Sequence, residues 1–183
     1  MKLSYQVFDL PLRHTFTIAH QSRDIQDTLI VTLEDAGFFG LGESTTNPFY
    51  GVTIETMTEA LEAFRPVLED TKTVNPETLW AMGKDYFKGN PFAQCALDMA
   101  AWDLFTKRQG LKLYQYLQLH PENIPTTNFT IGIASIEKMV QKMKEVDWPI
   151  YKIKLGTHDD LAIVKELRKH TDAVFRIDAN CAK

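Results

Sequence analysis

Two lysines in a short apolar segment are the side chains of this chain most clearly placed to do chemistry. Lys152 and Lys154 stand in Tyr-Lys-Ile-Lys-Leu, residues 151–155. Successive side chains of a β-strand point to opposite faces, so the two lysines share one face and the apolar residues share the other. Ammonium groups on a strand covered by helices are costly unless they are paired or do chemistry. Asp178 ends the next apolar segment and supplies a carboxylate that could pair with the lysines or bind a hard metal ion.

The second part of the chain alternates between strand and helix patterns. Strands are predicted at residues 128–134, 150–155 and 173–178, and helices at 135–146 and 159–170. This order predicts a parallel sheet with right-handed helical crossovers. Thr130, the two lysines and Asp178 are then expected at or near the carboxyl edge, where α/β barrels build their active sites. A complete barrel takes about 250 residues, so these units are expected to belong to a longer polypeptide.

The first part of the chain has the pattern of an antiparallel sheet followed by helices. Short strands are predicted at residues 2–12, 15–19, 28–33 and 38–43, and helices at 53–68, 92–109 and 111–119. Asn75-Pro76 and Asn90-Pro91 each place an N-cap residue before a proline at the first helical position. The sequence therefore predicts an α/β protein. An α+β capping domain spans residues 1–123, and the first three strands of a (β/α) TIM-type barrel occupy residues 124–183.

Composition excludes several classes of protein. The 183 residues are 44% hydrophobic and 24% charged, which is typical of a soluble globular protein. A net charge of −4 with no basic run argues against a nucleic-acid partner. No apolar run is long enough for a membrane span, and a cytoplasmic location is expected. The two cysteines and five histidines lack metal-ligand spacing.

Five motifs, in this order, resemble the enolase superfamily and, within it, the muconate cycloisomerase subgroup. They are Phe-Phe-Gly-Leu-Gly-Glu-Ser at 38–44, Ala-Leu-Asp-Met-Ala-Ala-Trp-Asp-Leu at 96–104, Asn-Phe-Thr-Ile at 128–131, Tyr-Lys-Ile-Lys-Leu-Gly at 151–156 and Arg-Ile-Asp-Ala-Asn at 176–180. The third motif resembles the first barrel strand of dipeptide epimerases, such as L-Ala-D/L-Glu epimerase. The resemblance covers the whole chain.

The resemblance implies a reaction and roles for three residues. Members of this superfamily remove the proton next to a carboxylate and stabilise the resulting enediolate on Mg²⁺. Lys154 matches the base on one face of the substrate carbon, Lys152 matches the lysine that touches the substrate carboxylate, and Asp178 matches the first metal ligand. Mg²⁺ requires several oxygen ligands. The resemblance therefore places the remaining ligands, a Glu and an Asp, and the opposite-face lysine beyond Lys183.

Other polar residues are candidates for substrate contact or for structure. Thr130 could contact the substrate carboxylate or be a structural threonine. Arg23 lies where the family's specificity loop falls, with its register open by a residue or two. Arg176 shares the face of Asp178 and is predicted to form a structural ion pair. Asp98 and Asp103 are predicted to be structural and to tie the two domains together.

The first interpretation is therefore Mg²⁺-dependent epimerisation of a small dipeptide at the α-carbon of its C-terminal residue, in cell-wall peptide turnover or dipeptide use. The alternatives within the superfamily are an o-succinylbenzoate synthase and a muconate cycloisomerase. A hypothesis of another class is a non-catalytic fragment or a binding scaffold. The dipeptide's side chains and the preference for Mg²⁺ over Mn²⁺ stay open, as does a homo-oligomer.

Overall fold

The chain divides into two compact units. The computed structural model describes residues 1–72 and 75–179. The first unit comprises Met1–Leu10 and Gln26–Asn123, and the second comprises Pro11–Ile25 and Ile124–Lys183. The sequence predicted a division of the chain into residues 1–123 and 124–183. Residues 11–25 are different, because the sequence assigned them to the capping domain and the structure groups them with the second unit.

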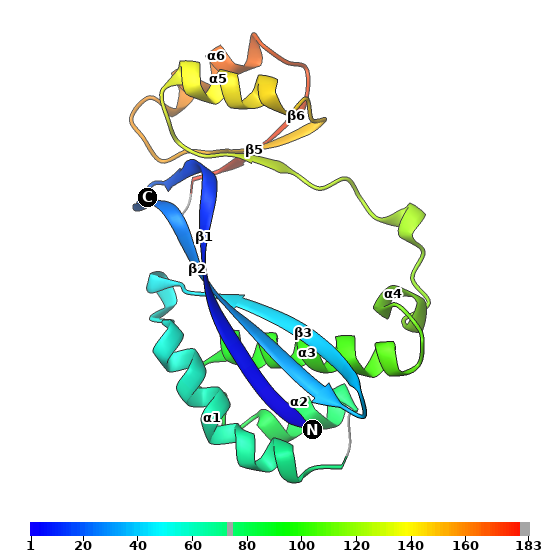
Figure 1. The fold of residues 1–183 in the computed structure, drawn as a ribbon. Helices are drawn as coiled ribbons and strands as arrows, with labels where there is room; N and C mark the ends of the chain where they lie inside the picture. Colours follow the sequence, from blue (N-terminus) through cyan, green and yellow to red (C-terminus); the bar gives the residue numbers. More distant parts are fainter. Residues whose placement is uncertain (73–74, 180–183) are drawn as a thin grey trace. The chain divides into compact units, whose positions relative to one another are not determined.

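The first unit contains a three-stranded sheet of order β1-β2-β3, built from β1 (Lys2–Ile18), β2 (Gln21–Asp35) and β3 (Phe38–Thr45) (Figure 1). Strands β2 and β3 pair antiparallel, from Thr28 opposite Thr45 to Asp35 opposite Phe38. The turn between them has positive φ at Ala36 (49°) and Gly37 (81°), the geometry that suits the twist of a two-residue hairpin. The predicted hairpin is confirmed. The two short strands predicted before it form the single strand β1.

Among the described residues of the first unit, four α-helices follow the sheet: α1 (Ile54–Asp70), α2 (Pro76–Gly83), α3 (Pro91–Arg108) and the short α4 (Leu113–Tyr116). Short 3-10 turns occupy Pro48–Tyr50 and Pro121–Asn123. The predicted caps are confirmed, because the side chains of Asn75 and Asn90 accept hydrogen bonds from backbone N–H groups at the starts of α2 and α3. The predicted helix 111–119 is wrong in length. The backbone leaves the helical region at Gln118, whose φ is 54°.

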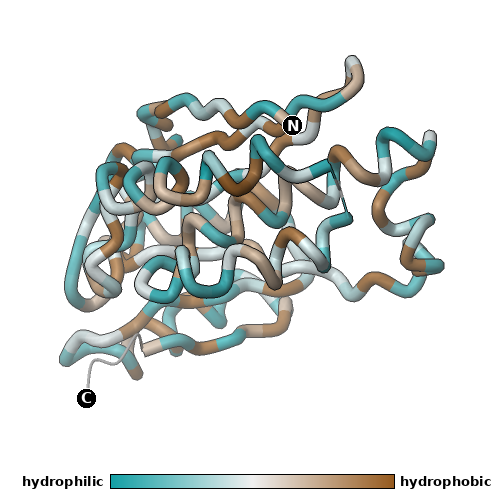
Figure 2. Tube along the Cα trace, turned by 90° about the horizontal axis from the view of Figure 1, so that it is seen from below, coloured by the Kyte–Doolittle hydropathy of each residue, from teal (hydrophilic) through white to brown (hydrophobic). Residues whose placement is uncertain are grey.

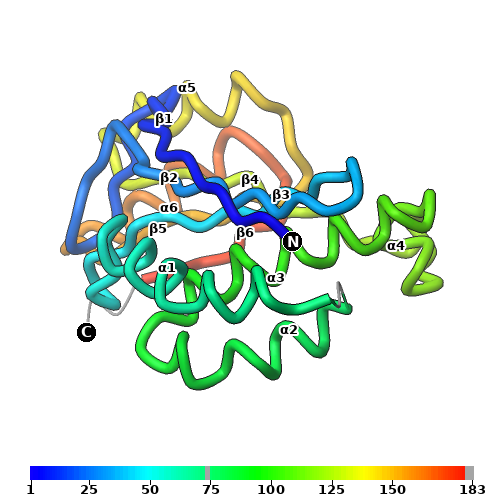
Figure 3. The backbone as a smooth tube through the Cα atoms, turned by 60° about the horizontal axis from the view of Figure 1, so that its bottom comes forward, coloured from blue at the N-terminus to red at the C-terminus, as the bar shows by residue number. Residues whose placement is uncertain are grey.

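The core of the first unit lies between the sheet and its helices. Strand β3 packs directly against α3, with α1 and α2 beside α3 (Figure 3). The fully buried side chains include Leu29, Leu33, Leu61, Phe64 and Leu104. Helix α1 places its buried residues at helical spacing, because an amphipathic helix turns one apolar stripe to the core. Short hydrophobic and hydrophilic segments accordingly follow one another along the chain (Figure 2).

An ion-pair cluster ties the start of β1 to α1. Arg65 donates to both carboxylate oxygens of Glu62 at 2.7 Å, and to the carbonyl oxygen of Leu3 at 2.5 Å. Hydrogen bonds from Arg65 and then from Tyr5 lower the pKa of Glu62 from 4.5 to about 2. Because this pKa is lower in the folded protein, the charged carboxylate stabilises the fold above pH 4.5. That stabilisation is lost as the pH falls toward 2.

We expect Glu62→Gln to lower the free energy of unfolding at pH 7 by about 1 kcal/mol or less, because the pair is largely exposed. Urea unfolding at pH 7 and pH 3, followed by far-UV circular dichroism, measures the effect. The gap between variant and parent should shrink at pH 3. Glu59→Gln, on the exposed face of the same helix, is the control. A gap that is equally large at both pH values would contradict the prediction.

The second unit is a parallel sheet covered by helices. Strands β4 (Phe129–Ile131), β5 (Ile150–Lys154) and β6 (Val174–Asp178) pair in parallel in chain order. Helices α5 (Ile136–Glu145) and α6 (Asp160–Arg168) connect them and pack on one face of the sheet (Figure 1). Each strand is added on the same side of the strand before it. The right-handed crossovers therefore put both helices on one face of the sheet, as in a barrel. The predicted fold class is confirmed: a capping unit followed by the first strand–helix units of a barrel.

Tyr151 fixes which face of β5 meets the helices. Its ring is 1% exposed, and its hydroxyl donates to the carbonyl oxygens of Met143 and Val146 and accepts from the N–H of Trp148. Ile153, two residues on, is fully buried in the same core. Alternation along the strand then turns Lys152 and Lys154 to the opposite face. In the described part of the chain, no helix is long and apolar enough to cross a membrane.

Candidate functional site

The face of the parallel sheet turned away from α5 and α6 carries rows of polar side chains. Lys152 lies in register with Thr130 on one side and Arg176 on the other, and Lys154 lies in register with Asp178. These residues come from three strands, and the Lys154–Asp178 row is at the carboxyl edge. The placement follows from parallel pairing, which brings the ends of successive strands to one edge of the sheet.

The two lysines share one carboxylate oxygen. The Nζ atoms of Lys152 and Lys154 lie 2.8 and 2.9 Å from Oδ2 of Asp178. The Lys154 side chain is 10% exposed, against 36% for Lys152 and 26% for Asp178. Two ammonium groups beside one carboxylate give the cluster a net charge of +1 in a partly desolvated environment. Such a cluster attracts an anion, and a carboxylate of a substrate is the simplest one.

The turn after β5 holds the Lys154 end of the strand in place. The N–H of Leu155 donates to the carbonyl oxygen of Asp178 at 3.0 Å, so the backbones of β5 and β6 stay paired past the lysine. Gly156 then adopts a φ of 125°, which favours glycine, and its N–H donates to the Asp160 carboxylate at 3.1 Å. Thr157 donates to the same carboxylate through its N–H and its hydroxyl. The turn therefore leads directly from the lysine strand into α6.

The tip of the β1–β2 hairpin, residues 11–25, contributes an aromatic ring to the site. Across its two-residue turn, the hydroxyl of Thr17 lies 2.8 Å from that of Ser22, and the hydroxyl of Thr15 donates to Asp24 at 2.6 Å. These contacts place Thr15 and Thr17 on one face of the hairpin, so alternation puts Phe16 on the other. The Phe16 ring centroid lies 5.9 Å from Nζ of Lys154.

The same pairing places Arg23 opposite Phe16 in the hairpin, on the face that meets Lys154. Arg23 is half-buried there. The site therefore combines predicted residues with one that the sequence analysis missed. Phe16 carries no motif, and only its position in the middle of a polar Thr-Phe-Thr segment marked it as unusual.

The other predicted residues have varied surroundings. Arg176 donates to the side-chain oxygen of Asn128 at 2.6 Å, and the ion pair predicted for it stays a prediction. Asp103 accepts from the N–H of Leu41 and from Lys107. Those contacts lie inside the first unit, and the tie between the two domains stays a prediction. Burial raises the pKa of Asp98 on the same helix. Asn180, the last residue of the motif at 176–180, lies outside the described residues.

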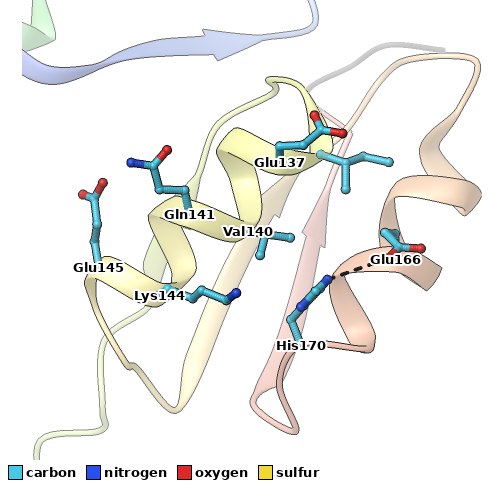
Figure 4. A pocket seen from close by; sticks show the side chains of 8 residues that line it. Glu137, Val140, Gln141, Lys144, Glu145, Glu166 and His170 are labelled. Atoms are coloured by element: carbon cyan, nitrogen blue, oxygen red, sulfur yellow. Dashed lines mark ion pairs between the residues drawn. The ribbon is translucent and has the colours of Figure 1, made fainter.

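A surface groove of about 790 Å³ runs between α5 and α6 on the helical side of the second unit (Figure 4). Val140 lies between the helices, and His170 forms an ion pair with Glu166 at 3.7 Å. Neither lysine of the polar cluster lines this groove, nor does Asp178. It is therefore separate from the candidate site, which lies on the other face of the sheet.

Asp178 suits a magnesium ion in ligand type but not in number. A half-buried carboxylate at the carboxyl edge offers the hard oxygen atoms that Mg²⁺ prefers. Within residues 1–72 and 75–179, no three His, Cys, Asp or Glu side chains are grouped so that they could hold a metal. The described residues therefore fit the role of one ligand, and further oxygen ligands are required.

Comparisons with known proteins agree with this architecture. The N-terminal domain of the mandelate racemase/muconate lactonizing enzyme family matches residues 3–117. An L-Ala-D/L-amino acid epimerase of Flavobacterium johnsoniae is 54% identical over 99% of this chain and 54% of its own length. An L-Ala-D/L-Glu epimerase of Bacteroides thetaiotaomicron is 31% identical over 98% of this chain and 47% of its own length. The chain thus spans about half the length of the curated relatives it matches.

A solved structure shows the same likeness in three dimensions. The dipeptide epimerase of Enterococcus faecalis, in complex with Mg and the dipeptide L-Leu-L-Tyr, has a TM-score of 0.89 and 30% identity to this chain. The match covers 99% of this chain and 53% of that one. The domain match extends over more than half of the chain. The chain belongs to the mandelate racemase/muconate lactonizing enzyme family of the enolase superfamily.

Proposed function

We propose that this chain carries part of the active site of a metal-dependent dipeptide epimerase. The observation that supports the proposal best is the cluster of Lys152, Lys154 and Asp178 on one face of the parallel sheet. Proton removal beside a carboxylate needs a base, a cation and a metal ligand, and the two lysines and Asp178 can supply these three roles. The likeness to several dipeptide epimerases adds to this argument.

In the proposed reaction, Lys154 in its neutral form accepts the proton from the α-carbon of the dipeptide's C-terminal residue. The C–H bond breaks, a new N–H bond forms, and the electron pair moves toward the substrate carboxylate. Lys152 holds that carboxylate by its positive charge. Return of a proton to the opposite face of the carbon inverts it, and the acid for this step is expected outside residues 1–183.

Asp178 is the described residue that would hold Mg²⁺. The bound metal would supply positive charge to the substrate carboxylate, which makes the neighbouring proton acidic enough to remove. Thr130 and Arg23 are proposed as substrate contacts. Thr130 lies in register with Lys152 on the same face, and Arg23 shares the hairpin face of Phe16.

Exchange of the α-proton with solvent tests this function directly. We expect the full-length protein with Mg²⁺ to introduce deuterium from D₂O into one residue class of a mixed dipeptide library, read by mass spectrometry. EDTA should abolish the uptake, because the carboxylate charge would then lack its counter-ion. Magnesium added back in excess should restore it. Uptake that survives EDTA would argue against a metal-dependent reaction.

A lack of uptake in every dipeptide would redirect the assignment. The same assay would then use the substrates of o-succinylbenzoate synthase and of muconate cycloisomerase, which need closely related lysines and the same kind of metal site. Failure with those substrates as well would favour a binding scaffold. Isothermal titration with the dipeptide library would then show whether the protein binds a dipeptide without converting it.

A further inference from the structure

We propose that Phe16 is a positioning residue for Lys154, holding the lysine head against Asp178 and keeping water away from it. The inference rests on the proposed function, because it concerns the base of that reaction. Phe16 belongs to β1 and is far from Lys154 in sequence. Through this residue, the tip of the β1–β2 hairpin contributes to the chemical step.

The two lysines of the site differ in their exposure to solvent. Both reach the same Oδ2 atom of Asp178, at 2.8 and 2.9 Å, yet the side chain of Lys152 is 36% exposed and that of Lys154 is 10% exposed. The ion pair therefore does not explain the burial of Lys154. The Phe16 ring, 5.9 Å from Nζ, lies against the more buried lysine. An aromatic face attracts a cation and at the same time displaces water from it.

The hairpin tip that carries Phe16 is held by contacts on both sides of this residue, to the segment after β4 and to α5. After Phe16, the carbonyl oxygen of Thr17 accepts from the N–H of Ile133 at 2.9 Å. Before it, His14 lies 2.9 Å from the Glu145 carboxylate at the end of α5. These contacts hold the backbone around Phe16 at the position from which its ring reaches Lys154.

Gly132 makes the approach of the hairpin possible. A Cβ atom at this position would lie 3.2 Å from the backbone N and O of Thr17 and 3.8 Å from Cδ2 of Phe16. Any side chain here would push the hairpin tip away from the end of β4. The small residue therefore matters for the position of Phe16, and its replacement offers a second test that leaves the ring itself unchanged.

Competitive labelling of lysines tests the position of Lys154 without relying on activity. The full-length protein is treated with limiting acetic anhydride, and labelling at each lysine is read by peptide mass spectrometry. We expect Phe16→Leu to raise labelling of Lys154 several-fold relative to Lys165, an exposed lysine of α6. Phe16→Tyr, which keeps the ring, should leave it unchanged, and Gly132→Ala should raise it. Phe8→Leu, on the same strand in the first unit, is the control.

Kinetics of the same variants provide the second readout. Phe16→Leu should lower kcat about tenfold with little change in KM, because the base is displaced while the substrate contacts stay. Phe16→Tyr should restore most of the rate. Unchanged labelling of Lys154 and unchanged kcat in Phe16→Leu would overturn the proposal, as would an equal loss in Phe16→Tyr. If the parent protein exchanges no α-proton but labelling still rises in Phe16→Leu, the proposed function fails and the positioning role stands.

Discussion

Replacing Lys154 by Met is expected to lower the rate of α-proton exchange about a thousandfold, because a positioned general base contributes about 10²- to 10⁴-fold. Met has nearly the same length and fills the same space beside Phe16 without a nitrogen to accept the proton. Asp178 keeps Lys152 as an ion-pair partner, so the sheet edge is not left with an unpaired carboxylate. Deuterium uptake by the preferred dipeptide, measured in single time courses, gives the rate.

Two further variants separate the base from the charge. Lys154→Arg keeps a cation next to Asp178, but a guanidinium does not lose its proton in proteins. We expect this variant to be as inactive as Lys154→Met. Lys165→Met, on the exposed surface of α6, should retain full activity. A rate in Lys154→Met above a tenth of the parent rate would show that another group removes the proton. Unfolding curves of all three variants check that the fold is intact.

Replacing Gly42 by Ala is expected to destabilise the first unit by about 3 kcal/mol, at the upper end of what overpacking usually costs. The Cβ of an alanine here would lie 1.8 Å from the carbonyl oxygen of Ala96 and 2.8 Å from the backbone N of Ala100. Both atoms belong to the backbone of α3, so no side chain can turn aside. Strand β3 and helix α3 must separate to accept the methyl group, which opens the core around Leu104.

Gly89→Ala is the matched control, because a Cβ at Gly89 would meet no heavy atom within 4 Å. Its stability should stay within about 0.5 kcal/mol of the parent, as for most surface substitutions. Urea unfolding followed by far-UV circular dichroism measures both variants. A Gly42→Ala protein as stable as Gly89→Ala would mean that β3 and α3 do not pack as closely as described. Gly40 lies equally close to α3, because a Cβ added there would lie 2.1 Å from the carbonyl oxygen of Ala100.

Local sequence was sufficient to predict most elements of the fold. Helix starts were predictable because Asn75 and Asn90 satisfy backbone N–H groups within the same turn. The hairpin between β2 and β3 was predictable because Asp35 and Gly37 are turn residues between two apolar segments, and Gly37 accepts the positive φ that its turn needs. Predictions failed where no local signal sets the end of an element. Strand β4 is only three residues long, shorter than predicted, since its length depends on the strand beside it.

The sequence by itself determined the chemistry available to this protein. Alternation along β5 puts Lys152 and Lys154 on one face, and the order of strand and helix places Asp178 in the neighbouring strand. Only the tertiary structure decided that residues 11–25 group with the second unit and that Phe16 lies against Lys154. Such a contact joins residues 138 positions apart. The contact depends on the close approach of the hairpin tip to Gly132 and on backbone hydrogen bonds between distant segments. Neither feature produces a periodic pattern in the sequence.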